Sequence, residues 1–192
     1  MSILIAGLIL FLGMHSVRMA ADGWRTARLA TWGERGWKGL YTLVSLVGFA
    51  LIIWGFGLAR MQTIQLWSPP AWTKPVASVL VLIAFVLIAA AYVPGNRIRA
   101  RLGHPMVAGV KTWALAHLLA NGSLADVVLF GAFLVWAVLD FRSLRRRDRE
   151  QGTKRGGGNV TGDALAVVAG LIAWLLFAYW LHGRLFGRPL LG

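Results

Sequence analysis

The stretch that decides the fold is residues 104–141, which read HPMVAGVKTWALAHLLANGSLADVVLFGAFLVWAVLDF. It is apolar over most of its length, but the polar sequence Asn-Gly-Ser at 121–123 interrupts it, and an aspartate follows three residues after the serine. The pattern predicts two helices, over about 104–120 and 124–141, that are joined by a tight turn. Each is close to the roughly 20 residues that an α-helix needs to cross a bilayer.

The turn between these two helices carries its own signals. Gly122 suits the left-handed position that commonly ends a helix. Ser123, followed three residues later by Asp126, has the spacing of a capping box, in which each side chain accepts from a backbone N–H of the other residue. We therefore expect Gly122 to close the first helix and Ser123 to open the second.

Four more apolar stretches extend this pattern to the rest of the chain, over about 1–20, 39–59, 75–96 and 164–186. Hydrophobic residues make up 58% of the 192 residues and charged residues only 14%, against roughly 45–50% and about 25% in ordinary globular domains. Lipid is the solvent that so much apolar surface needs. We predict one all-α domain over 1–192, a polytopic transmembrane bundle of about six helices.

The basic residues predict the orientation of this bundle. The net charge is +13, which in a soluble protein would suggest nucleic acid. Here the basic residues lie mainly between the apolar stretches, in successive groups of 5, 2, 3, 0 and 7, with Arg184 and Arg188 in the tail. By the positive-inside rule, we expect both chain ends outside, contact with membrane lipid and no nucleic-acid partner.

Two loops carry further predictions. Trp24, Arg28 and Trp32 recur every four residues, so we expect an interfacial helix in the first loop. The stretch 151–162 contains three consecutive glycines and is expected to be a flexible cytoplasmic loop. It lacks the Gly-Lys-Ser/Thr ending of a phosphate-binding loop, so we do not expect it to bind a nucleotide.

The candidates for chemistry are the four histidines, because polar residues inside membrane spans are costly and are functional candidates by default. His15, His104, His117 and His182 all lie in or beside predicted spans. The chain has no cysteine, which excludes disulfides, zinc–thiolate and iron–sulfur sites, a cysteine nucleophile and covalent haem attachment. A neutral imidazole is a good iron ligand, and two from different helices can hold haem b from opposite faces.

The position of each histidine along its helix leaves the pairing open. His15, in the inner part of the first span, matches His104 in depth about as well as it matches His117. Lys111 is expected either to extend to the membrane surface or to pair with a haem propionate. Trp113 suits a porphyrin wall but equally suits contact with lipid.

Two other interpretations of the histidines stand beside haem. An intramembrane histidine is often only a hydrogen-bond partner between helices. A non-haem iron site with two histidines would need a carboxylate from Asp126 or Asp140, both near span ends, and is less favoured.

Three stretches resemble the NnrU family of bacterial membrane proteins: GMHS at 13–16, GERGWKGLYTLVSLVGFALIIW at 33–54, and residues 103–147. The most specific part is the His-Pro pair at 104–105 followed by WALAH at 113–117. This resemblance implies an integral protein of the bacterial inner membrane that is linked to denitrification, in the reduction of nitrite and nitric oxide.

The NnrU family is itself similar to the zeta-carotene isomerase of plastids and cyanobacteria, an integral membrane haem b enzyme that isomerises a cis double bond of a polyene. The resemblance implies His15 and His117 as the axial iron ligands and His104 as a further motif histidine, either a reserve ligand or a supporting residue. The isomerase has a cysteine three residues before its second ligand. Ala114 stands at that position here, so exchange to a thiolate ligand cannot occur.

Three functions follow from these patterns, and whether the protein is an enzyme stays open. The first is a haem b protein of nitrogen-oxide metabolism, with nitric oxide as ligand or a membrane redox partner. The second is a haem-dependent cis–trans isomerase of a polyene. The third is a non-catalytic membrane scaffold or transporter in which the histidines are merely packed.

Overall fold

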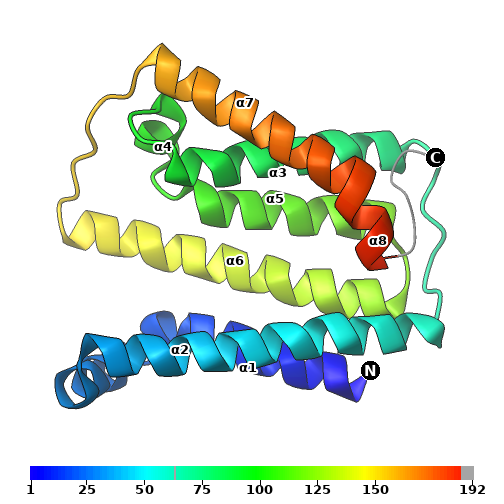
Figure 1. Cartoon of the computed structure of the whole chain (residues 1–192), viewed down its shortest axis with the longest axis horizontal. Coiled ribbons are helices and arrows are strands. Elements are labelled where there is room, and N and C mark those ends of the chain that lie inside the picture. The colour runs from blue at the N-terminus through cyan, green and yellow to red at the C-terminus, as the bar shows by residue number, and fades with distance from the viewer. Residues whose placement is uncertain (63, 187–192) are drawn as a thin grey trace. The chain divides into compact units, whose positions relative to one another are not determined.

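A computed structural model describes residues 1–62 and 64–186, and these fold almost entirely into helices (Figure 1). Arg188, which we assigned to the outer tail, lies outside the described residues. The elements are α1 (Ser2–Ala20), α2 (Asp22–Met61), α3 (Thr73–Tyr92), α4 (Arg97–Leu102), α5 (Pro105–Ala120), α6 (Leu124–Glu150), α7 (Val160–Leu176), the π-helical segment η1 (Phe177–Leu181) and α8 (His182–Phe186).

Among the described residues, five helical segments are long and apolar enough to cross a membrane: α1, α2, α3, α6 and the segment Val160–Arg184. The prediction of an all-α, multi-span protein is therefore confirmed. The sixth predicted span is α5, which has 16 residues and so a length of about 24 Å, a little short of the roughly 30 Å hydrocarbon core.

The chain forms two compact units, each described by itself below. The first comprises Met1–Ser68 and Gly122–Trp136, and the second comprises Pro69–Asn121 and the chain from Ala137 onward. Helix α6 contributes to both units. The single domain that we predicted over the whole chain stays a prediction.

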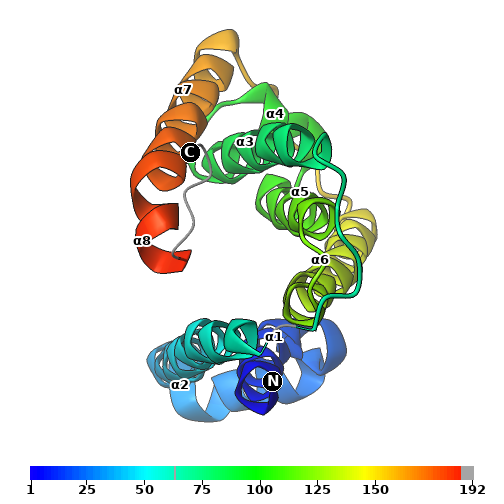
Figure 2. The ribbon, with the colours of Figure 1, turned by 90° about the vertical axis from the view of Figure 1, so that its right-hand side faces the viewer.

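The first unit begins with the antiparallel pair α1 and α2, which lie side by side in Figures 1 and 2. Three glycines bring the two backbones close. A Cβ atom on Gly7 would lie 2.7 Å from Ile52 N, and one on Gly48 would lie 2.7 Å from Phe11 N. A Cβ on Gly55 would lie 2.7 Å from the Cα atom of the buried Leu4. Such close backbone approach is typical of helix packing in membranes.

Helix α2 begins at Asp22, whereas the predicted span begins at residue 39. Gly33 has φ 69° and ψ 172°, which breaks the element into two helices. The first of these contains Trp24, Arg28 and Trp32, so the helix predicted in the first loop is confirmed. The Arg28 guanidinium lies 5.7 Å from the Trp24 ring centroid and 5.5 Å from that of Trp32, which is cation–π distance.

The turn between α5 and α6 has the predicted capping box but not the predicted glycine geometry. Asp126 N donates to Ser123 Oγ over 3.2 Å, and Ser123 Oγ donates to Asp126 Oδ2 over 2.6 Å. Gly122 is not among the glycines with positive φ, so its predicted left-handed conformation is wrong; Asn121 ends α5 in an extended conformation instead. Gly122 is needed for a different reason, because a Cβ there would collide with the carbonyl oxygen of Trp67.

In the second unit, α3 lies between α5 and α7 (Figure 2). Its core holds Ala77, Val81 and Ala116, with the indole rings of Trp113 and Trp174 packed against them. Small alanine side chains let the helices approach and leave the two tryptophans to fill the space.

At one end of this unit, hydrogen bonds from side chains and backbone connect the start of α4 to the start of α7. Asn96 accepts from Arg99 N over 2.6 Å and begins α4, a short helix that we did not predict. Asn159 N donates to Gly95 O over 2.8 Å, and Asp163 Oδ1 accepts from Arg97 N over 2.6 Å. The stretch predicted as a flexible loop is therefore held where it joins α7.

The α1–α2 contact predicts a difference between two neighbouring glycines of α2. Gly55→Ala should lower the free energy of unfolding by about 1–3 kcal/mol, because its Cβ would press on the α1 backbone. Gly57→Ala, whose Cβ meets nothing within 4 Å, should be neutral or stabilising through helix propensity. Thermal unfolding of both variants in detergent tests this, and equal loss in both would show that the close approach is absent.

Candidate functional site

His15 lies on α1, one helical turn after Phe11. Its Nδ1 atom is 2.7 Å from the backbone oxygen of Phe11. Because a carbonyl oxygen can only accept, Nδ1 must carry the ring proton, and in the neutral ring Nε2 then carries the lone pair. The helix itself thus fixes His15 in the tautomer that a metal ligand needs at Nε2.

Aromatic rings surround His15 in the first unit. Phe11 stacks on the imidazole at 4.2 Å between centroids, Tyr41 lies at 5.1 Å, and Trp136 meets it edge-on at 6.0 Å. Among the described residues, the buried Nε1 atom of Trp136 has no hydrogen-bond partner, and neither has Ser45 Oγ, one turn along α2 from Tyr41. Buried unpaired polar atoms are rare in proteins and call for an explanation.

His117 repeats this arrangement on α5. Its Nδ1 atom is 2.9 Å from the backbone oxygen of Trp113, so it has the same tautomer as His15. The Trp113 ring lies 5.1 Å from the imidazole centroid. Trp174, which shares a core cluster with Trp113, has a buried Nε1 atom that finds no partner among the described residues.

His104 differs from both. It precedes α5, and its Nε2 atom lies 2.8 Å from Asp148 Oδ2 near the end of α6. A carboxylate accepts, so here Nε2 carries a proton. Arg155 Nη2 donates to the same carboxylate oxygen and stands 3.3 Å from His104 Nε2. Since Nε2 is already a donor, that last approach is a contact without a hydrogen bond.

The Asp148 carboxylate follows the apolar part of α6, among the arginines of its last turns. The hydrogen bond from the Arg155 guanidinium, helped by that from His104, holds the pKa of Asp148 below its ordinary value. The sequence did not indicate this trio, because Asp148 and Arg155 lie far along the chain from His104 and share no local pattern with it.

The other candidates have specific places as well. The Lys111 ammonium lies 4.8 Å from the Phe141 ring centroid in a cation–π contact. His182 lies edge-on to Phe177 at 5.9 Å. His15 belongs to the first unit, whereas His104, Lys111, Trp113 and His117 belong to the second. Among the described residues, no three His, Asp or Glu side chains gather as a metal site.

The trio of His104, Asp148 and Arg155 predicts a pH dependence. Because folding lowers the Asp148 pKa, its stabilisation is complete above the ordinary value of 3.8 and is lost as the pH falls below it. Asp148→Asn should lower the melting temperature by a few degrees at neutral pH and by progressively less below pH 3.8. Glu150→Gln, which removes an exposed pair with Arg146, should change little at neutral pH. An equal effect of both variants there would contradict the assignment.

Comparison with known proteins gives one family. The family described as NnrU protein matches residues 3–190, nearly the whole chain. No curated protein and no solved structure matches the chain. The match covers both units and includes His15, His104 and His117. This chain belongs to the NnrU family.

Proposed function

We propose that this protein is a haem b-binding membrane protein that acts in nitrogen-oxide metabolism, with His15 and His117 as the iron ligands. The observation that carries the proposal is the shared tautomer of these two histidines. Each donates Nδ1–H to the carbonyl one turn earlier and presents the Nε2 lone pair that iron requires. His104 donates from Nε2 to Asp148, so the proposal gives it a supporting role.

The surroundings of His15 fit a large, flat, apolar group with polar edges. Aromatic rings of Phe11, Tyr41 and Trp136 lie around His15. A Cβ on Gly13 would meet nothing within 4 Å, so the backbone beside His15 is open. The buried indole N–H of Trp136 finds no acceptor among the residues that the structure describes and could donate to a bound group.

The chain's own part in this function is to bind, orient and exclude water. Bound haem would supply an iron centre that takes up electrons or a small ligand such as nitric oxide. The Nδ1–H bonds hold each imidazole at a fixed rotation and raise its basicity as a ligand. The apolar helices around the histidines keep water from the centre and so tune its potential.

The link to nitrogen oxides rests on the resemblance to the NnrU family described above. Polyene isomerisation is the alternative that the same resemblance raises. Ala114 is fully buried on α5 and offers no thiolate near His117, so any such activity would need another route to an open iron position. A membrane scaffold without haem is the third possibility.

The histidine assignment predicts spectra of the purified protein. Wild type should carry about one haem b per chain, with a Soret band and sharp reduced bands in dithionite. His15→Ala and His117→Ala should each abolish or reshape the Soret band, because each removes an iron ligand. Absorbance spectra and a pyridine haemochrome assay measure this.

Two control variants separate a ligand from a merely nearby histidine. His182→Ala and His104→Ala should keep the band, since neither is assigned to iron. Loss of the band in His182→Ala but not in His15→Ala would overturn the ligand pair. Wild type without haem, even after expression with a haem precursor, would refute haem binding altogether. If wild type does carry haem, the next assays are nitric oxide binding and isomerisation of a cis polyene.

A further inference from the structure

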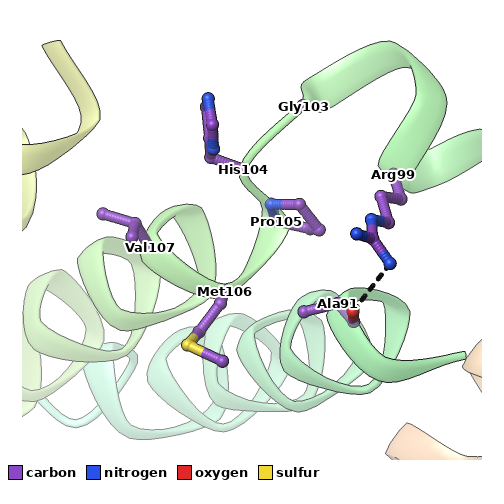
Figure 3. Close-up of a pocket in the computed structure, with 7 residues that line it drawn as sticks. All are labelled: Ala91, Arg99, Gly103, His104, Pro105, Met106 and Val107. Carbon is purple, nitrogen blue, oxygen red and sulfur yellow. Dashed lines mark hydrogen bonds between the residues drawn. The ribbon is translucent and has the colours of Figure 1, made fainter. Parts of the chain in front are cut away.

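Two hollows adjoin at the end of the second unit where α3, α4 and α5 meet. The smaller, of about 230 Å³, is lined mainly by apolar residues, among them Ala91, Pro105, Met106 and Val107. Figure 3 shows Arg99 reaching across it towards Ala91, while the His104 ring points away. The hollow is thus apolar with a guanidinium at its border.

The larger hollow, of about 590 Å³, is polar over about half of its lining. Its lining includes the side chains of Arg99, Arg155 and Thr153 and the glycines Gly156 and Gly157. A Cβ on either of these glycines would meet nothing within 4 Å, so their backbone is open to a ligand. The two hollows share Arg99, Gly103 and His104 and therefore adjoin. We call the two together the recess, which has an apolar part and a part with basic side chains.

In the part of the chain that the structure describes, Arg99 has no ion-pair partner. Among the described residues, its guanidinium donates to one acceptor, Ala91 O, over 3.3 Å, and no carboxylate lies within ion-pair distance of it. Arg155 is different because Asp148 already binds it. The recess therefore carries an excess positive charge on a side chain with several N–H groups left to donate.

The place of the recess in the bundle suggests the source of its ligand. It lies where the apolar helix α3 ends. The basic helix α4 and the segment that follows the arginine-rich end of α6 line it there. Such a border between apolar and basic residues is expected at the cytoplasmic surface of a membrane, where anionic lipids concentrate. Lys and Arg clusters between helices on that side bind lipid headgroups.

We propose that this recess binds an anionic phospholipid. Its phosphate lies in the basic hollow against Arg99 and the open backbone of Gly156 and Gly157, and the start of its acyl chain lies in the apolar hollow beside Met106. A guanidinium presents a planar fork that matches two phosphate oxygens. This site is independent of the proposed haem site and uses none of its ligands.

The test measures lipid binding by native mass spectrometry of the detergent-purified full chain with added phosphatidylglycerol. Arg99→Gln should weaken the binding about tenfold, as expected for the loss of a charge-assisted hydrogen bond. Arg101→Gln is the matched control, because it makes the same change on the same short helix at an exposed residue outside the recess. Arg99→Lys should retain most of the binding.

A second variant separates a lipid from a free anion. Met106→Glu places a carboxylate in the apolar hollow and should weaken phosphatidylglycerol binding, while phosphatidylcholine should bind wild type more weakly than phosphatidylglycerol does. Equal binding by Arg99→Gln and Arg101→Gln, with both variants folded by circular dichroism, would overturn the site. Inorganic phosphate that displaces phosphatidylglycerol at millimolar concentration would overturn the lipid assignment in favour of a free anion.

Discussion

Polar groups inside an apolar chain must find their partners within the protein, because lipid offers none. In this protein that constraint acts on single ring nitrogens. His15 and His117 place their ring N–H on the carbonyl one turn earlier, the acceptor that a helix provides. The choice of acceptor fixes the tautomer, and the tautomer decides which nitrogen can bind iron. Local backbone geometry thereby sets the chemistry that each histidine can perform.

The same constraint shapes the basic end of the second unit, where two carboxylates each accept from a residue that is distant in the sequence. Asp163 on α7 accepts from Arg97 at the start of α4, and Asp148 on α6 accepts from His104 and Arg155. These contacts bring α4, α5, α6 and α7 together at one end. Within residues 1–62 and 64–186, Arg99 has no such carboxylate and donates to Ala91 O instead, so the recess beside it carries charge available to a ligand.

The features that could be predicted from the sequence are those that local pattern determines. Apolar length predicted the spans, and the spacing of Ser123 and Asp126 predicted a cap that the structure confirms. Gly122 was correctly placed in the turn but for the wrong reason, since the close approach of Trp67 arises from a segment far along the chain. Helix α4 was missed because its stabilising partner, Asp163, is equally distant.

The contacts of the candidate site residues also separate into those that local sequence determines and those that distant segments supply. The i, i−4 hydrogen bonds of His15 and His117 are local, whereas the partners of His104 follow it by more than forty residues and could not be predicted. The assignment of His15 and His117 to iron stays a prediction. Helix α5 follows His104 and bears His117 thirteen residues, or about 20 Å, further along. The two rings have protons on opposite nitrogens. One helix can therefore carry the proposed iron ligand, His117, near one end, while His104 at its other end binds the terminus of α6. The two histidines of this motif would then have different roles.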